Sequence, residues 1–199
     1  MTTTPEPSSD DPRAVRSRQR LGEALVRVLA REDLSSIGVA ELCREAGVHR
    51  TTFYGHYDSV GELAADVYAS MIDEAATASP RPGDRPDAIS RAYLDATVSL
   101  LRAIARDRQA IRSLLDSPVS LGFRKRLRSH FLRKAASAIS VIRDSGVDLP
   151  ENTDVGAAYV AGGIVSAIEL WASVDGDDAE AFAQRIFANM PRWWPAPSA

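Results

Sequence analysis

A break in a helical pattern between Ile37 and Tyr57 constrains the fold of this chain more than any other feature. Apolar residues recur at helical spacing from Val39 to Ala46, and the next residue, Gly47, can adopt a positive φ. A second short helix is expected to begin near His49. The segment therefore predicts two short helices joined by a tight turn, which is a helix-turn-helix.

The second of these helices has one side for the core and another side that carries hydrogen-bond donors. Val48, Thr52 and Phe53 form the apolar side. The remaining side chains can donate hydrogen bonds or stack, and they are Arg50, Thr51, Tyr54 and His56. In a helix-turn-helix the second helix enters the major groove of DNA, where such side chains reach base edges and phosphates.

The sequence GVHRTTFYGHYDSVGEL, residues 47–63, resembles the turn, the recognition helix and the start of the following helix in the TetR family of transcriptional regulators. The Gly turn, the Thr-Phe-Tyr core, the His-Tyr exit and a Glu-Leu pair coincide in it. The resemblance is close over residues 13–75, and beyond them the helical plan and the size agree. It implies an all-α fold of about nine helices, with a three-helix head and a C-terminal bundle for ligand binding and dimerisation.

The resemblance and the composition together predict four parts of the chain. Residues 1–12 are rich in Thr, Pro, Ser and Asp, which is typical of a disordered tail. Residues 13–58 are expected to form the DNA-binding head, 59–191 the ligand-binding and dimerisation body, and 192–199 a C-terminal tail. The Pro-rich segment 79–86 is expected to end the fourth helix.

The charge of the chain favours a nucleic-acid partner only when it is followed along the sequence. The formal net charge of the whole chain is −3. Residues 13–57, however, carry eight arginines against five acidic side chains. A small basic segment in an acidic protein is expected where one face meets phosphates and the remainder stays soluble. The second basic run, residues 124–134, is interpreted as a solvated helix face.

The resemblance also implies which side chains would contact DNA. Arg50 is the candidate for base readout, to guanine, with Thr51 beside it. Thr52, Tyr54, His56, Tyr57 and Ser59 are expected to contact phosphates. The full set of candidate DNA-binding residues is Gly38, Val48, His49, Arg50, Thr51, Thr52, Tyr54, His56, Tyr57 and Ser59. A twofold dimer would present two such helices to an inverted-repeat operator, and a repressor released by its ligand is the expected function.

Two positions depart from the pattern of the family. Gly38 stands where many relatives have a Thr whose hydroxyl would meet a phosphate, and Val60 stands where a Lys is common. Because each neutralised phosphate adds to affinity through counterion release, we predict a shallower salt dependence of DNA binding than a typical relative shows. The same departures keep an alternative open, in which the chain is a helical dimeric scaffold whose helix-turn-helix no longer binds DNA.

A small-molecule effector is expected in the C-terminal body by resemblance. Each apolar candidate for its pocket is more often simple core than a ligand contact. Glu169 and His130 are the polar groups that could select a ligand, and the alternative for both is a satisfied or exposed side chain. The candidate pocket residues are Tyr93, Leu94, Phe123, Leu127, His130, Phe131, Glu169 and Trp171.

Two C-terminal stretches are more apolar than one protomer needs. Residues 155–171 are apolar nearly all the way round a helix, and residues 179–190 continue with an apolar seam. A second copy of the chain is the simplest cover, which predicts a homodimer with a four-helix interface centred near Trp171 or Phe182. The candidate interface residues are Ala161, Ile164, Ile168, Trp171, Phe182, Ile186 and Phe187.

The sequence offers no pattern for catalysis or for a metal. We find no nucleophile elbow, no phosphate-binding Gly loop and no paired carboxylates near a His. The three histidines lack metal-ligand spacing, and the single cysteine, Cys43, is interpreted as core filler. The start of the chain lacks the pattern of a signal peptide, and the longest uncharged run, residues 155–168, is shorter than a membrane span. We therefore expect a cytoplasmic protein that is not an enzyme, has no cofactor and binds no membrane.

Overall fold

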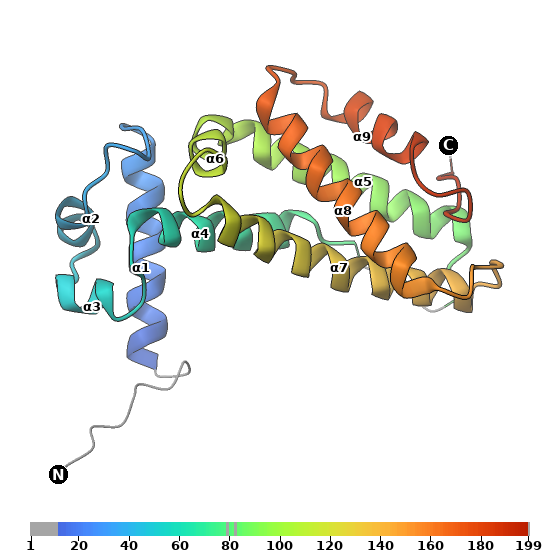
Figure 1. Ribbon diagram of the computed structural model, residues 1–199, viewed down its shortest axis with the longest axis horizontal. Helices are drawn as coiled ribbons and strands as arrows, with labels where there is room; N and C mark the ends of the chain where they lie inside the picture. Colours follow the sequence, from blue (N-terminus) through green and yellow to red (C-terminus); the bar gives the residue numbers. More distant parts are fainter. Residues whose placement is uncertain (1–11, 79, 82, 199) are drawn as a thin grey trace, which may run out of the picture. The chain divides into compact units, whose positions relative to one another are not determined.

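The computed structural model describes residues 12–78, 80–81 and 83–198, and these residues form nine α-helices and no strand (Figure 1). The helices are α1 Pro12–Leu29, α2 Val39–Ala46, α3 Arg50–Tyr54, α4 Val60–Ala75, α5 Pro86–Arg106, α6 Arg108–Leu115, α7 Ser120–Asp144, α8 Thr153–Ser173 and α9 Ala179–Ala188. The predicted all-α fold class is confirmed for this part of the chain. The disordered tail predicted at residues 1–12 lies outside the described residues, apart from Pro12, which begins α1.

Contacts divide the chain into two compact units, residues 1–67 and 68–199. The sequence places the boundary between head and body at residues 58–59, before α4, whereas the contacts divide the structure inside α4. The first residues of α4 pack in the first unit, where Leu63 is fully buried. The last residues of α4 pack in the second unit, where Ile72 is fully buried.

The first unit is a three-helix head, closed by the start of α4, around one small core. The buried face of α1 includes Leu21 and Leu25, and α2 packs against this helix. Phe53 of α3 is fully buried as well. Gly22 permits a close approach between α1 and α4, since a Cβ there would lie 3.3 Å from Val67. A long amphipathic α1 thus provides the rigid base on which the two short helices rest.

Ser59 caps the N-terminus of α4. Its hydroxyl oxygen accepts a hydrogen bond from the Glu62 amide at 3.1 Å. The Glu62 carboxylate in turn accepts one from the Asp58 amide at 2.7 Å. These bonds satisfy amides that have no partner inside the helix, and a cap of this kind contributes about 1 kcal/mol.

In the second unit α7 packs along α8, α5 packs along α9, and α6 contacts both α7 and α8 (Figure 1). Apolar side chains at a four-residue spacing form the buried face of α7. The residues of that face are Phe123, Leu127, Phe131, Ala135 and Ile139. Basic side chains such as Lys125 and Arg128 are exposed, in agreement with a solvated face.

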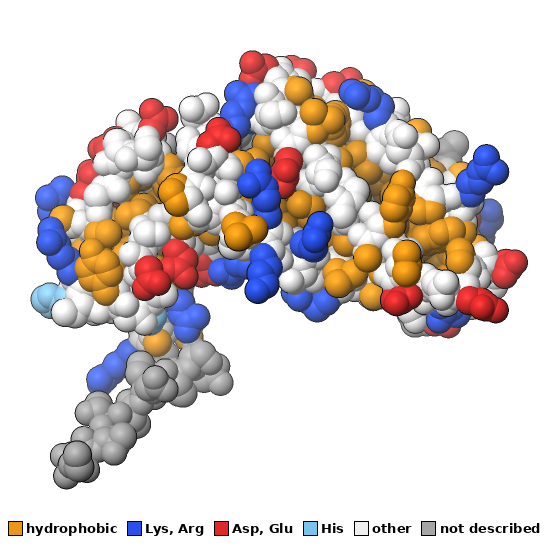
Figure 2. Space-filling view, in the orientation of Figure 1, with side chains coloured by type: hydrophobic (Ala, Val, Ile, Leu, Met, Phe, Trp, Pro, Cys, Tyr) orange, Lys and Arg blue, Asp and Glu red, His pale blue; other side chains and the backbone are white. Residues whose placement is uncertain are grey.

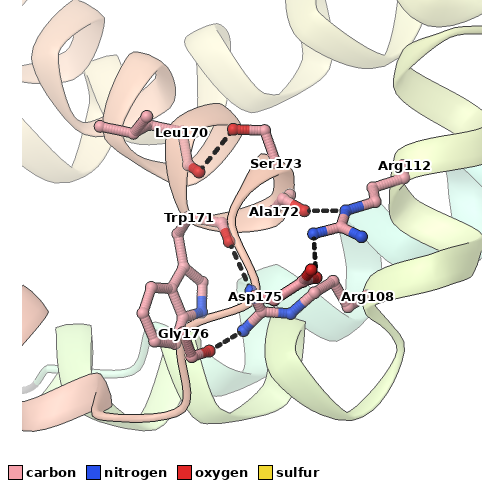
Figure 3. Close-up of polar contacts among 8 residues, drawn as sticks. All are labelled: Arg108, Arg112, Leu170, Trp171, Ala172, Ser173, Asp175 and Gly176. Atoms are coloured by element: carbon pink, nitrogen blue, oxygen red, sulfur yellow. Dashed lines mark hydrogen bonds and ion pairs between the residues drawn. The ribbon is translucent and has the colours of Figure 1, made fainter.

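Two arginines of α6 cap the C-terminal end of α8 (Figure 3). Arg108 donates to the carbonyl of Trp171 at 2.9 Å and to the carbonyl of Gly176. Arg112 donates to the carbonyl of Ala172 at 2.5 Å. The last carbonyls of a helix lack intrahelical partners and attract cations, so these contacts fix α6 to the end of α8.

Among the described residues, α8 is the one helix long and apolar enough to cross a membrane by length and composition. The uncharged run counted from the sequence is shorter than this helix because the helix continues through Asp154 and Glu169. In the structure α8 packs against α5, α6 and α7, and 39% of its apolar window is buried. The expectation that the protein binds no membrane stays a prediction.

Candidate nucleic-acid interface

Gly47 forms the turn between α2 and α3. Its φ of 64° and ψ of 37° are left-handed, as predicted. Its amide donates to the Arg44 carbonyl at 3.3 Å, and the Val48 amide donates to the Cys43 carbonyl at 3.0 Å. Glycine adopts this conformation without a steric cost, whereas other residues pay about 1–2 kcal/mol. The turn therefore sets the direction in which α3 leaves α2.

We expect Gly47→Ala to lower the free energy of unfolding by about 1–2 kcal/mol because alanine resists a positive φ. No atom lies within 4 Å of a Cβ added there, so the effect isolates backbone strain. Urea denaturation followed by circular dichroism measures it. Gly122→Ala is the matched control, since that helical glycine also has open space around it and should be stabilised by up to about 1 kcal/mol. A stabilised Gly47→Ala would contradict this role of the turn.

One buried side chain, Phe53, fixes the orientation of α3. Its ring is fully buried and contacts the rings of Tyr54 and Tyr57, with centroids 5.4 and 6.1 Å away. With Phe53 directed inward, the predicted contact residues Arg50 and Thr51 are exposed, as is Tyr54 with 58% of its surface accessible. The short helix thus presents polar side chains on its outer face.

Arg50 retains its full capacity to bind a nucleic acid. It is exposed, and its guanidinium has no hydrogen bond or ion pair with any described residue. Two other arginines of the head, by contrast, are engaged: Arg27 of α1 and Arg31, just after α1, pair with Glu45 at 2.9 and 3.5 Å. The hydrogen bond from Arg27 lowers the pKa of the Glu45 carboxyl. Figure 2 shows basic side chains over the surface of α2 and α3.

His49 directly precedes α3, and His56 follows the end of this helix. His49 is exposed, and its carbonyl accepts the first helical bonds, from the amides of Thr52 and Phe53. His56 is half-buried, and burial together with the positive charge of Arg18 lowers its pKa. The imidazole of His56 is therefore neutral at pH 7 and can donate one hydrogen bond.

Tyr57 differs from the expectation of a phosphate contact. The side chain is buried, with 7% of its surface exposed, and its hydroxyl donates to the Asp66 carboxylate at 2.7 Å. This bond ties the exit of α3 to α4. We therefore assign Tyr57 to the support of the interface and omit it from the proposed contacts.

The remaining candidates lie at the edges of this face. Val48, Thr52 and Ser59 are half-buried, and the Ser59 oxygen is engaged in the cap of α4. Gly38 is exposed at the N-cap of α2, with no side-chain cap and open space around its Cα. Val60 is buried, with 8% exposed, so a lysine there would need to direct its ammonium outward past the core.

Cys43 lies in the core of the head, with 4% of its surface exposed. Burial raises the pKa of its thiol, and the charge of Arg50 opposes that shift. A protonated, buried thiol is a poor nucleophile, in agreement with a packing role. The described part of the chain contains no group of three or more His, Cys, Asp or Glu side chains that could hold a metal ion.

The second unit contains a cavity of about 60 Å³ between α5, α7, α8, α9 and the C-terminal tail. Tyr93 and Phe131 line it, as predicted. Lys134 and Trp194 also line it, although the sequence does not predict them there. Lys134 belongs to a basic run and Trp194 to a short tail, so no local sequence pattern indicates that either residue borders a cavity.

The other six predicted pocket residues do not line this cavity. Glu169 pairs with Arg124 at 2.8 Å, and Nδ1 of His130 lies 2.5 Å from the Asp73 carboxylate. Burial lowers the pKa of His130, although the charge of Asp73 opposes this effect. Four residues are packed in the core of the unit: Leu94, Phe123, Leu127 and Trp171.

The predicted dimer-interface residues divide into two groups. Three are half-buried, and they are Ile164, Ile186 and Phe187. Four are buried inside the protomer, and they are Ala161, Ile168, Trp171 and Phe182. The exposed apolar side chains of α8 are instead Val155, Tyr159 and Leu170, with 64%, 68% and 50% of their surfaces accessible. Figure 2 shows hydrophobic side chains over the surface of α8.

Comparison with known proteins gives one match in sequence and several in structure. No family model matches the sequence. The uncharacterized HTH-type transcriptional regulator YxbF of Bacillus subtilis is 35% identical over 74 residues, which cover 35% of this chain. The match spans only 20% of the length of YxbF.

Solved structures match nearly the whole chain. RolR in complex with resorcinol has a TM-score of 0.65 at 18% identity, with 89% of each chain covered. The TetR family repressor AlkX from Dietzia sp. strain DQ12-45-1b, implicated in biodegradation of n-alkanes, has a TM-score of 0.62 at 18% identity, covering 94% of this chain and 97% of AlkX. The TetR regulator TylP from Streptomyces fradiae has a TM-score of 0.60 at 18% identity, covering 89% of this chain and 86% of TylP.

These likenesses agree with the geometry of the head. The segment of the chain that resembles the family in sequence forms α2, the left-handed Gly47 turn and α3. The named relatives are regulators rather than enzymes. The chain therefore has the fold of the TetR family of transcriptional regulators, as its sequence resemblance predicts.

Proposed function

We propose that the chain is a sequence-specific DNA-binding regulator in which α3 enters the major groove. One observation carries the proposal: the guanidinium of Arg50 is exposed and has no partner among the described residues. It lies on a helix whose orientation is fixed by Phe53 and Gly47. A bidentate contact from arginine to guanine is the commonest specific contact in the major groove. The names of the relatives support the same function.

Exposed arginines of α1, such as Arg16 and Arg20, are proposed to approach the phosphate backbone. Retention of the protein on heparin, and the loss of that retention as salt rises, distinguishes a DNA-binding head from a scaffold that does not bind DNA. A regulator is expected to be retained at low salt and released as salt rises. Each phosphate contact contributes about −0.9 to the slope of the logarithm of the binding constant against the logarithm of the salt concentration. A protein of pI near 5.7 whose head has lost DNA is expected to pass through without retention.

The proposal includes a homodimer through α8 and α9. These two helices border an open groove of about 550 Å³, lined on α8 by Tyr159 and Leu170 and on α9 by Ile186. Exposed apolar side chains beside such a groove are typical of a protein interface. A twofold axis there would present two copies of α3 to an inverted repeat, with half-sites about 34–36 Å apart or a multiple of that distance. We assign such a regulator to the cytoplasm.

We expect Leu170→Arg to weaken this dimer by at least about tenfold, because an unpaired charge would be buried in an apolar interface. Half of the Leu170 surface is exposed, so the protomer itself should keep its fold. Sedimentation velocity over a range of concentrations measures the effect. Leu121→Arg, at a leucine of α7 that is 77% exposed, is the matched control and should leave the dimer intact. A dimer that survives Leu170→Arg would place the interface elsewhere.

A small-molecule effector in the cavity of the second unit completes the proposal. RolR was solved with resorcinol, and AlkX is implicated in the degradation of n-alkanes, so small and largely apolar molecules are connected with this fold. The cavity is bordered by Ala76, which directly follows α4. An effector that widens the cavity would displace the end of the helix that leads to the head, and so release DNA.

A further inference from the structure

The wall of the body cavity combines a large apolar surface with a single charge. Aliphatic, aromatic and thioether side chains together supply most of the wall, among them Phe131, Phe187 and Met190. Lys134 of α7 is the one charged residue among the described residues that line it, and no acidic side chain joins it there. A ligand that matches this wall is therefore mostly apolar and carries negative charge at one end.

Lys134 is available to pair with such a charge. Its side chain is half-buried and has no ion pair or hydrogen bond with any residue that the structure describes. Two acids that contact α7 from other helices have other partners: Asp73 lies against Nδ1 of His130, and Glu169 forms an ion pair with Arg124. Because no described residue supplies a counter-charge, an anion that reaches this ammonium gains affinity.

Tyr93 adds a neutral donor to the cavity wall. Burial raises the pKa of its phenol, which therefore remains protonated at neutral pH. Within the described residues its hydroxyl has no hydrogen-bond partner. The neighbouring Thr97 hydroxyl donates to the Tyr93 carbonyl at 2.8 Å. An ammonium and a phenolic O–H together suit the two oxygens of a carboxylate.

Trp194 closes the cavity from the C-terminal tail. Its indole N–H donates to the Ser90 hydroxyl at 3.0 Å, so the indole offers the cavity only apolar surface. The segment 191–198 lies outside the helices and is held by few bonds, one of them from the Ser198 amide to the Asp87 carbonyl at 3.3 Å. Ligand pockets usually measure about 300 Å³ or more, so a ligand must displace part of this 60 Å³ cavity's wall. The tail is the part of the wall without helical hydrogen bonds.

We propose that the cavity binds a small apolar monocarboxylate, whose carboxylate pairs with Lys134 and Tyr93 and whose hydrocarbon part displaces the indole of Trp194. The inference rests on the proposed function in taking this cavity as the effector site. A neutral hydrocarbon would leave Lys134 without a counter-charge. A sugar or a dicarboxylate would place further polar groups against an apolar wall without partners, which is unfavourable.

The test is calorimetric titration of the full chain with straight-chain carboxylates from propionate to octanoate and with benzoate. The primary alcohol of equal length, and benzyl alcohol for benzoate, serve as neutral counterparts. At least one carboxylate is expected to bind about tenfold more tightly than its alcohol. Failure of every carboxylate to bind, or equal binding of acid and alcohol, would overturn the inference.

Lys134→Met keeps the length and apolarity of the side chain and removes its charge. It is expected to abolish the preference for the carboxylate, while binding of the alcohol is unchanged. The chain contains one other lysine, Lys125, which is exposed on α7, so Lys125→Met is the matched control and should bind like the wild type. Lys134→Gln, with circular dichroism of each variant, guards against a loss of fold. A carboxylate preference that persists in both Lys134 variants would contradict the assigned role.

Trp194→Leu tests the displaced wall separately. A smaller side chain removes the indole that a longer hydrocarbon must displace, so octanoate is expected to bind several-fold more tightly than it binds the wild type. Unchanged or weaker binding of octanoate would contradict displacement of Trp194.

Binding of duplex DNA is measured on the same preparations, so that the two proposals can fail independently. A protein that binds DNA but no carboxylate overturns the ligand assignment and leaves the regulator intact. If the protein binds a carboxylate through Lys134 but does not bind DNA, the ligand assignment stands and the proposed DNA-binding function is overturned.

Discussion

Trp171→Ala is expected to lower the free energy of unfolding by about 3–5 kcal/mol. Only 2% of the Trp171 surface is exposed, and its indole N–H donates to the Leu101 carbonyl at 2.8 Å. The ring of Phe182 lies 4.8 Å away and the guanidinium of Arg108 4.7 Å away, each measured to the centroid of the indole. Truncation would leave a cavity in the core and would remove the hydrogen bond from the indole N–H. The free energy of unfolding of a domain is about 5–15 kcal/mol, so this one residue contributes a large share of the stability of the body.

Urea denaturation monitored by circular dichroism measures the loss. Trp171→Phe keeps a ring and removes the indole N–H, so it is expected to cost about 1–2 kcal/mol. Trp193→Ala is the matched control, because Trp193 is half-buried and packs beside Gly156 near the surface. It should cost less than half as much as Trp171→Ala. Equal losses at the two tryptophans would contradict the central place of Trp171 in the core.

Arg50→Ala is expected to weaken binding to the preferred operator by about 1–3 kcal/mol and to relax the preference at one base pair. Its guanidinium is exposed on α3 and unengaged by any described residue, so its loss should leave the head folded. Tyr54→Phe should weaken binding to all sequences alike, since the Tyr54 hydroxyl is assigned to a phosphate. The two variants thus separate base readout from positioning.

Fluorescence anisotropy with the preferred operator and with single-base variants of it measures both effects. Arg128→Ala removes an exposed arginine of α7 in the second unit and serves as the control, for which no change is expected. Uniform weakening across all sequences by Arg50→Ala would remove Arg50 from base readout and reassign it to a phosphate.

The features of the head that could be predicted from the sequence are local. Gly47 determines the turn and Phe53 the inward side of α3, and the structure confirms both. In each case the deciding contact lies within a few residues. Tyr57 is the exception in this region. Its phenol was free to point outward in the sequence pattern, and its bond to Asp66 depends on how α4 folds back over the exit of α3.

The sequence does not predict which side of α8 packs inside the protomer and which side is exposed, because the helix is apolar nearly all the way round. The sequence predicts Trp171 and Phe182 at an interface between protomers, whereas the structure places both inside one protomer. The direction of Trp171 is fixed by Arg108 and by the Leu101 carbonyl, 63 and 70 residues away in sequence. The exposed residues, such as Tyr159, become apparent only once the packing side is known.

The composition of the cavity also depends on contacts between distant parts of the chain. Trp194 reaches Ser90 across 104 residues of sequence. Lys134 shares a basic run with exposed residues such as Lys125, and only the packing of α7 distinguishes the two lysines. A helical pattern predicts which side of a helix is buried, but the positions that border an internal cavity depend on several helices at once.

Selection of bound duplexes from a random DNA pool by the purified full chain at moderate salt tests the central claim most directly. A regulator with Arg50 in the major groove is predicted to enrich an inverted repeat, with half-sites one helical turn apart or a multiple of that spacing. Absence of any enriched sequence, at low salt as well, would contradict the regulator and favour a helical scaffold whose head no longer binds DNA.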